Sequence, residues 1–262
     1  MIVIKYGGHA LPLAGEKDST LELVAEAHNS GQEIILVHGG GPQIDVELTI
    51  HGISTEMVSG YRSTTPEVFE IVQKVLSGQV LRTLVNQLIG FGANAVGLSA
   101  ADGAIIRAIK MEPLVNGTPV NIGLVGDISS SDSTLLRLLV SNGYLPVVSP
   151  ISVSESGLGL NLNADLAAGA IGGALRAEQV IFMTDVEGIY RNYPDRNSIM
   201  HETTATELRE LAPTFTAGMI PKAKAALAAL GAGAASVRII DGRDSKNLES
   251  ALMGTGGTLV LP

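Results

Sequence analysis

The sequence predicts an α/β protein: an αβα sandwich built on a mostly parallel central sheet. Three observations carry this prediction. Apolar runs rich in β-branched residues recur along the chain, stretches of helical periodicity lie between them, and glycine-rich or polar segments follow the runs. Continuous apolar strands that alternate with helices are typical of βαβ units, in which helices cover both faces of a parallel sheet.

Five apolar runs are the candidate strands of this sheet: residues 2–6, 33–37, 144–150, 178–185 and 236–240. In three other places polar and apolar residues alternate and turn residues follow, namely around residues 53–62, 104–111 and 157–165. This two-residue period predicts antiparallel hairpins, which we expect to extend the same sheet.

Helix signals separate the strands. Ser19 and Glu22 have the spacing of a capping box, and an apolar periodicity continues from them to about residue 29. Pro66 follows two threonines and opens a long helix. One face of that helix carries four apolar residues, Val68, Ile71, Val72 and Val75.

A division into two lobes is expected after a helix over residues 164–177, because a new strand begins at about Glu178. The predicted lobes are residues 1–175 and residues 176–262. At about 150 residues per domain, a chain of 262 residues is compatible with one large or two modest domains.

Composition limits the classes of function. The formal net charge is -9 without a long basic run, which argues against binding to nucleic acid or to an anionic membrane. The absence of cysteine excludes disulfides, thiolate catalysis and cysteine metal sites, and it fits a reducing compartment. No signal-peptide pattern is present, and no apolar stretch approaches the ~20 residues of a membrane span. We therefore expect a cytoplasmic protein that acts on small molecules.

Functional residues are expected where strands end, because ligands of open α/β sheets collect at the carboxyl ends of the strands. Lys5 lies near the end of the first strand, before Gly7 and Gly8. An ammonium in that position either reaches water or meets an anion, and the glycines would let a phosphate approach the backbone. A lysine before a plain turn is the alternative, and these residues alone leave both readings open.

The second junction runs from Gly39 to Gly41, after His38 and before Pro42. Glycines free the backbone amides at the start of a helix, where the helix dipole favours a carboxylate or a phosphate. A tight turn needs one glycine, so three in a row favour anion binding. We interpret His38 as a packed or hydrogen-bonded histidine rather than a catalyst.

Arg62 lies between a predicted hairpin and the long helix. Its planar fork could hold a carboxylate at two points, although a surface arginine near a helix start is the alternative. Asn161, Asn163 and Asp165 occupy alternating positions, so an extended chain would direct their side chains to one face. Asp165 could cap the helix that follows or take part in catalysis.

Two further residues complete the set of candidates. Asp185 follows a predicted strand, and Lys222 stands at the start of an alanine-rich helix, where it could also be a solvated charge. The sequence lacks a P-loop, a zinc-protease motif, a serine-hydrolase motif and a kinase catalytic loop. Zinc and serine-hydrolase chemistry therefore have no support.

Taken in chain order, these segments resemble the amino-acid kinase superfamily, and within it the N-acetylglutamate kinases. The resemblance spans nearly the whole chain and is carried by IKYGG, VHGGGPQID, GYRSTTPE, GLVGDI, NLNAD, MTDVEGIY and GMIPKAKAAL. It implies N-acetyl-L-glutamate in the N-terminal lobe and MgATP in the C-terminal lobe. The implied reaction is ATP-dependent phosphorylation of the γ-carboxylate to N-acetyl-L-glutamyl 5-phosphate, in arginine biosynthesis.

The resemblance also implies roles for individual residues. Lys5 and Lys222 would stabilise charge on the phosphoryl group in transfer, and Asp165 would orient both lysines. Gly8 and Gly40 would donate their amides to the phosphoryl oxygens. A carboxylate is already a nucleophile at neutral pH, so catalysis would depend on alignment and charge neutralisation rather than on a general base.

The remaining implied contacts divide between substrate and nucleotide. The amino-acid substrate would be held by Gly40, Gly41, Arg62 and Asn161, with Arg62 on its α-carboxylate. The nucleotide would meet Lys5, Asp185, Val186, Gly188, Thr216 and Lys222. Mg²⁺ would be held mainly by the ATP phosphates and water, so no protein residue is assigned as a metal ligand.

A homodimer joined through the long helix that starts near Thr65 is implied as well. Arginine-inhibited members of the family carry an N-terminal helical extension, whereas here the lysine strand begins at residue 2. We therefore expect no arginine feedback. The chain also departs from many relatives at His9, where they have a smaller residue or asparagine.

Two other functions stay open from the sequence. A related kinase acts on aminoadipate or glutamate attached to an acidic carrier protein, and it should present a basic docking surface. The net charge of -9 and the lack of a Lys/Arg cluster near Arg62 argue against it. A non-catalytic nucleotide sensor is the other, but it would not need to retain Lys5, Lys222 and Asp165.

Overall fold

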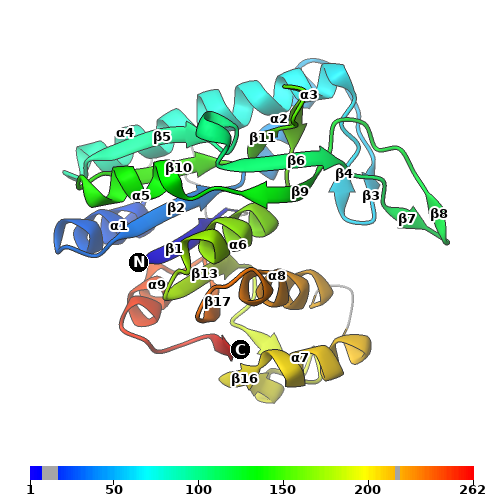
Figure 1. Cartoon of the computed structure of the whole chain (residues 1–262). Helices are drawn as coiled ribbons and strands as arrows, with labels where there is room; N and C mark the ends of the chain where they lie inside the picture. The colour runs from blue at the N-terminus through cyan, green and yellow to red at the C-terminus, as the bar shows by residue number, and fades with distance from the viewer. Residues whose placement is uncertain (8–16, 216–218) are drawn as a thin grey trace.

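The computed structural model describes residues 1–7, 17–215 and 219–262. Its main sheet has eight strands in the order β16-β18-β17-β13-β1-β2-β10-β5 (Figure 1). Neighbouring strands are parallel except β17 and β18. The strands are β1 (Ile2–Tyr6), β2 (Ile34–His38), β5 (Ala95–Ser99), β10 (Leu145–Ser149), β13 (Gln179–Thr184), β16 (Glu202–Thr204), β17 (Val237–Asp241) and β18 (Thr258–Leu261).

Helices form layers on the two faces of this sheet, as an αβα sandwich requires (Figure 1). On one side α6 packs against α8, β1 and β13, and on the other α1 packs against α4 and α9. The helices are α1 (Ser19–Asn29), α2 (Gly41–Ile50), α3 (Pro66–Gln73), α4 (Leu81–Gly90), α5 (Thr134–Ser141), α6 (Ala164–Leu175), α7 (Ala205–Leu211), α8 (Ile220–Gly231) and α9 (Ser245–Leu252). The predicted fold class is confirmed.

The register of the central strands brings their carboxyl ends together. Tyr6 of β1 lies opposite His38 of β2, and Lys5 lies opposite Phe182 of β13. All five predicted strands are present, and β1 has the predicted bounds. The segments after β1, β2 and β13 therefore emerge at one edge of the sheet, where a ligand site is expected.

Hairpins form at residues 57–62 and 151–161, whereas residues 106–110 are one strand whose antiparallel partner is residues 126–131. None of these strands extends the main sheet. A second sheet has the order β12-β11-β6-β9, made of β6 (Ile106–Lys110), β9 (Gly126–Ser131), β11 (Ile151–Val153) and β12 (Gly159–Asn161). Three small two-stranded sheets are β3 (Met57–Val58) with β4 (Tyr61–Arg62), β7 (Leu114–Val115) with β8 (Thr118–Pro119), and β14 (Ile189–Tyr190) with β15 (Ile199–Met200). The hairpins β3–β4 and β7–β8 project at one end of the molecule (Figure 1).

The long helix begins at Pro66, as predicted, and continues as α3, a π-helical stretch from Lys74 to Val80 (η2), and α4. Thr65 is its N-cap, and its Oγ1 accepts a hydrogen bond from the Val68 amide at 3.3 Å. The four residues predicted to share a face, Val68, Ile71, Val72 and Val75, are all at most 5% exposed. Burial of this apolar stripe holds the helix against the body of the protein.

Helix α1 ends at Asn29, as predicted, but its N-cap is Asp18 rather than Ser19. The Asp18 carboxylate accepts hydrogen bonds from the amides of Thr20 and Leu21, and it also accepts one from the Tyr6 hydroxyl. A carboxylate that caps a helix and meets a buried tyrosine leaves no capping role for Ser19.

One continuous sheet crosses the boundary between the predicted lobes, because β1 pairs with both β2 and β13. The division at residues 1–175 and 176–262 stays a prediction. Among the residues that the structure describes, none of the helices has the length and apolar character needed to cross a lipid bilayer.

Candidate active site

Tyr6 and Gly7, at the end of β1, touch the start of the β2–α2 loop at the carboxyl edge of the sheet. The Gly39 amide donates to the Tyr6 carbonyl at 2.9 Å. A Cβ added to Gly7 would lie 3.0 Å from the Gly39 nitrogen, so a side chain there would push the two loops apart. The first two predicted junctions therefore form one surface. Gly8, His9 and Thr216 lie outside the described residues.

Lys5 forms an ion pair with Asp165, with 3.0 Å between Nζ and Oδ1. Their side chains are 12% and 28% exposed, so water screens this pair only in part. Asp165 lies in the first turn of α6, where the helix dipole also favours a carboxylate. The cap of α6 is Asn163, whose Oδ1 accepts from the amides of Asp165 and Leu166. Of the two roles considered for Asp165, capping is therefore wrong.

Lys222 lies in the first turn of α8 and forms an ion pair with Asp185, with 3.0 Å between Nζ and Oδ1. Asp185 directly follows β13. Partial burial acts to raise the pKa of Asp185, but the hydrogen bond and charge of Lys222 outweigh it and lower that pKa. The two lysines are thus paired with different aspartates. Orientation of both by Asp165 stays a prediction.

Three glycines link β2 to α2, and Gly40 is the N-cap residue of that helix. A Cβ on Gly40 would lie 2.7 Å from Leu76 Cδ2 and 3.3 Å from Val80 Cγ2, both in the π-helical stretch η2. Gly41 has no described atom within 4 Å of its Cβ position. Glycine at 40 is therefore required by packing against η2, and its amide is held at the start of a helix.

His38 is fully buried, and its Nδ1 lies 2.8 Å from the Gly39 carbonyl oxygen. Burial lowers the pKa of His38 to about 4, so the ring is neutral at physiological pH. Nδ1 then donates to Gly39 and fixes the start of the glycine loop. The interpretation of His38 as a packed, hydrogen-bonded histidine is confirmed.

A cavity of about 200 Å³ adjoins the glycine loop. It brings together four residues that the sequence assigned to substrate: Gly40, Gly41, Arg62 and Asn161. They come from the β2–α2 loop, the β3–β4 hairpin and the end of β12. Arg62 supplies positive charge at the cavity wall, and the loop supplies backbone amides, so the cavity suits a ligand with more than one anionic group.

The Lys5–Asp165 ion pair lies beside this cavity rather than in its wall. Asn163 and Ala164 line the cavity and directly precede Asp165. The Cε atom of Lys5 lies 3.5 Å from a Cβ built on Gly7, which touches Gly39. A ligand in the cavity that reached the glycine loop would thus approach Lys5. Lys222 lies instead on α8, where it pairs with Asp185 at the end of β13.

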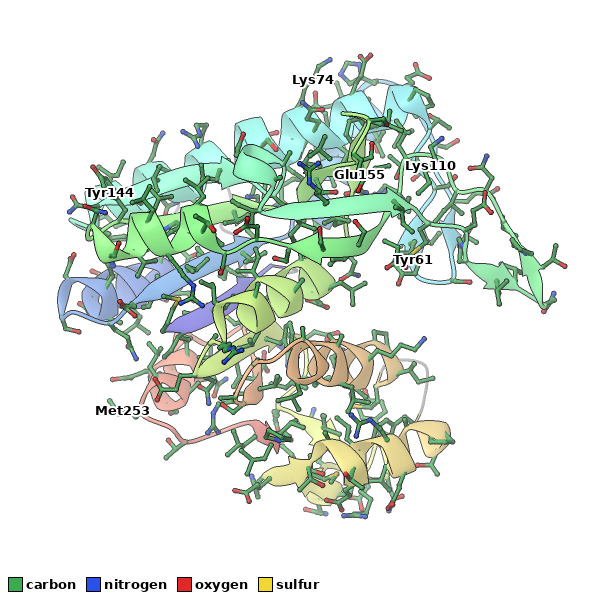
Figure 2. All side chains as sticks on the ribbon, in the orientation of Figure 1. Tyr61, Lys74, Lys110, Tyr144, Glu155 and Met253 are labelled. Atoms are coloured by element: carbon green, nitrogen blue, oxygen red, sulfur yellow. The ribbon has the colours of Figure 1, made fainter. Side chains whose placement is uncertain are left out.

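The cavity is also lined by residues that sequence reasoning missed, among them Met57 and Tyr61 in the β3–β4 hairpin. Figure 2 labels Tyr61. Burial, and the negative charge of Asp127, raise the pKa of Tyr61, so the phenol stays protonated. The only signal for these residues in the sequence was their place in a predicted hairpin beside Arg62.

The segment predicted to contact the nucleotide, residues 185–188, is fixed by hydrogen bonds that involve Thr184 of β13 and Thr258 of β18. Thr184 Oγ1 donates to the Val186 carbonyl at 3.1 Å, and Thr258 Oγ1 accepts from the Ile189 amide at 2.8 Å. A Cβ on Gly188 would lie 2.4 Å from Thr258 Oγ1, so packing alone requires glycine there. Contact of this segment with a nucleotide stays a prediction. Within the described ranges, no cluster of three or more His, Cys, Asp or Glu residues could hold a metal ion.

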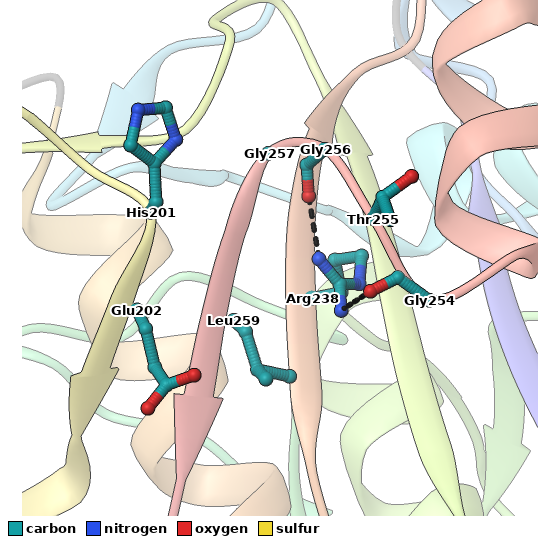
Figure 3. A pocket seen from close by; sticks show the side chains of 8 residues that line it. All are labelled: His201, Glu202, Arg238, Gly254, Thr255, Gly256, Gly257 and Leu259. Carbon is teal, nitrogen blue, oxygen red and sulfur yellow. Dashed lines mark hydrogen bonds between the residues drawn. The ribbon is translucent and has the colours of Figure 1, made fainter.

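A second cavity, of about 310 Å³, lies near the amino end of β17 (Figure 3). Its buried Arg238 donates to the carbonyls of Gly256 at 2.5 Å and Gly254 at 2.8 Å, which ties the α9–β18 loop to the sheet. The polar junctions lie instead at the carboxyl ends of β1, β2 and β13. The first cavity is therefore the candidate active site.

Comparison with known proteins agrees with this geometry. A model described as "Amino acid kinase family" matches residues 1–241. A protein named acetylglutamate kinase from Salinispora tropica is 41% identical over 266 residues, covering 100% of this chain and 89% of that protein. One of the same name from Corynebacterium glutamicum is 41% identical over 264 residues, covering 100% and 90%.

Solved structures resemble the chain as well. N-acetylglutamate synthase from Neisseria gonorrhoeae has a TM-score of 0.83 and 24% identity, over 100% of this chain and 59% of that one. Carbamate kinase from Giardia lamblia bound to AMP-PNP has a TM-score of 0.68 and 20% identity, over 99% and 97%. At these identities the likeness shows a shared fold.

Proposed function

The chain belongs to the amino acid kinase family, and we propose that it phosphorylates the γ-carboxylate of N-acetyl-L-glutamate at the expense of ATP. The product would be N-acetyl-L-glutamyl 5-phosphate, an intermediate of arginine biosynthesis. Curated relatives named acetylglutamate kinase, 41% identical along nearly their whole length, support the substrate and the reaction.

One observation in the site carries the proposal: a cavity with Arg62 in its wall adjoins a glycine loop and, beside it, the Lys5–Asp165 pair. The substrate is a dicarboxylate, and this arrangement offers a separate cation or amide donor to each end. Arg62 would grip the α-carboxylate, and the side-chain carboxylate would point toward Gly40 and Lys5.

Phosphoryl transfer to a carboxylate requires that the two reactants be aligned and that their negative charges be neutralised. Both reactants are anions, so their approach is opposed by repulsion that positive groups must offset. Lys5 and Lys222 would neutralise the phosphoryl oxygens in the transition state, and the glycine amides would donate hydrogen bonds to them. The carboxylate attacks without prior loss of a proton, which agrees with a site whose histidine is buried and neutral.

The nucleotide is part of the same proposal. ATP would lie against Lys222 and the segment Asp185 to Gly188, and two lysines with the backbone amides of the glycine loop fit the charge of its phosphates. Mg²⁺ would be held mainly by the ATP phosphates and water, where it supplies further positive charge. Residues 1–175 would bind the amino acid and residues 176–262 the nucleotide, in a cytoplasmic homodimer joined through the helix that follows Thr65.

A direct assay follows ADP release from MgATP in the presence of hydroxylamine, which traps an acyl phosphate as a hydroxamate. N-acetyl-L-glutamate is compared with glutamate, aspartate and aminoadipate. We expect hydroxamate only with the acetylated substrate. If none of the four gives hydroxamate although ATP binds, the proposal fails in favour of a carrier-bound substrate or a nucleotide sensor.

A further inference from the structure

Arg62 is held on two sides by residues of the protein itself. Its Nη2 lies 2.6 Å from Asp45 Oδ1, and its Nη1 donates to Thr55 Oγ1 at 2.9 Å. Arg62 lines the cavity, whereas Asp45 and Thr55 are not among the described residues that line it. These two contacts therefore act on the guanidinium from outside the ligand space.

The hairpin that carries Arg62 is a small element. Its strands β3 and β4 have two residues each, so few ladder hydrogen bonds fix it. A free arginine side chain loses about 2 kcal/mol of rotamer entropy when it is fixed. Contacts that fix the guanidinium in advance reduce the part of this cost that falls on ligand binding.

Exposure indicates what the ion pair contributes. The Arg62 side chain is 14% exposed, but that of Asp45 is 62% exposed. Water screens a pair that is open on one side, so its contribution to the stability of the fold is small. The ion pair still fixes one orientation of the planar Arg62 guanidinium. That group has five N–H donors, so donors remain for a ligand after the contacts with Asp45 and Thr55.

The position of Asp45 links the two ends of the cavity. Asp45 lies on α2, the helix whose N-cap is Gly40. Gly40 lines the cavity at the start of the same helix that holds Arg62 through Asp45. The separation between the arginine fork and the glycine loop is therefore set by one rigid element.

We infer that Asp45 is a positioning residue for substrate recognition: it orients Arg62 toward the α-carboxylate and fixes that grip relative to the glycine loop. The inference rests on the proposed function and adds a residue outside the cavity that controls affinity for the amino acid. Because the ion pair acts on binding of the substrate and not on the phosphoryl group, its loss raises KM for N-acetyl-L-glutamate selectively.

The test compares Asp45→Ala and Asp45→Asn with the unmodified protein in steady-state kinetics. We expect Asp45→Ala to raise KM for N-acetyl-L-glutamate by about 3- to 10-fold, with kcat and KM for ATP nearly unchanged. Asp45→Asn keeps an oxygen acceptor for Nη2 and should restore part of the affinity. Glu47→Gln is the matched control on the same helix, because Glu47 contacts His51 instead, and it should leave all three constants unchanged.

Three results would overturn the inference: an unchanged KM, a lowered KM, or a fall in kcat without a change in KM. A lowered KM would mean that Asp45 competes with the substrate for Arg62. Failure of the proposed function is seen separately, because the unmodified protein would then give no product with N-acetyl-L-glutamate. In that case the inference falls with it.

Discussion

The contact between Gly40 and the π-helical stretch η2 makes a sharp prediction for Gly40→Ala. A methyl group at this position would lie 2.7 Å from Leu76 Cδ2 and 3.3 Å from Val80 Cγ2. Leu76 and Val80 are 2% and 6% exposed, so neither can swing into solvent. The side chains or the loop must shift, and overpacking of this kind costs about 1–3 kcal/mol.

The expected cost appears in two measurements. For a chain of this size 1 kcal/mol corresponds to a shift in Tm of about 2–4 °C, so thermal unfolding should show a loss of a few to about 10 °C. Displacement of the glycine loop also moves the Gly40 amide away from the phosphoryl group. A misplaced contact can lower turnover by up to about 100-fold, and we expect kcat to fall by about 10- to 100-fold.

Gly41→Ala is the control, since no described atom lies within 4 Å of its Cβ position. It keeps the amide and adds a methyl group at the first residue of α2, where alanine favours the helix. Its Tm should stay constant or rise slightly. The reasoning is refuted if Gly40→Ala has the same Tm as Gly41→Ala and the same kcat as the unmodified protein.

Two other predictions concern charge. Lys222→Ala should lower kcat by about 100-fold or more with KM values largely preserved, as expected for a contact that is strongest in the transition state. The control Lys224→Ala changes an exposed lysine and should leave kcat unchanged. Near-normal turnover of Lys222→Ala would remove Lys222 from the mechanism. His38 contributes a pH dependence because burial lowers its pKa from 6.5 to about 4. The contribution of His38 to the free energy of unfolding is therefore fully present above pH 6.5. It is lost as the pH falls from 6.5 toward 4, by up to about 3 kcal/mol, because over this range only the unfolded chain protonates the histidine. In urea unfolding, His38→Asn should lose less free energy of unfolding between pH 7.5 and pH 4.5 than the unmodified protein. Equal losses in the two proteins would contradict this assignment.

Much of the fold could be predicted from the sequence because the central strands are buried on both faces. The runs at β1, β2 and β13 are almost wholly apolar, and their bounds were predicted within one or two residues. The edge strand β5 was missed: its residues are all partly exposed, and it contains Gly97, which lies under Arg82. Placement of the alternating segments in sheets of their own depends on long-range pairing, which local periodicity does not encode.

The location of the site could be predicted for a similar reason. Parallel strands end at one edge, so residues that follow different strands are brought together. Their partners could not be predicted, since Asp45 meets Arg62 and Asp185 meets Lys222 only through the tertiary structure. The sequence offered Asp165 as a cap of α6, but the structure gives that role to Asn163. Both residue types are good caps, and only the backbone decides between them.

The central claim is that the γ-carboxylate of N-acetyl-L-glutamate attacks the γ-phosphorus of ATP directly, and oxygen transfer tests it most directly. The substrate is labelled with ¹⁸O in both oxygens of that carboxylate and turned over with MgATP and hydroxylamine. Hydroxylamine attacks the acyl carbon, so the released phosphate keeps the oxygen that bridged carbon and phosphorus. We predict one ¹⁸O atom in each phosphate released with hydroxamate, measured by mass spectrometry. Phosphate without ¹⁸O would mean that water, not the carboxylate, had attacked ATP, and it would contradict the account.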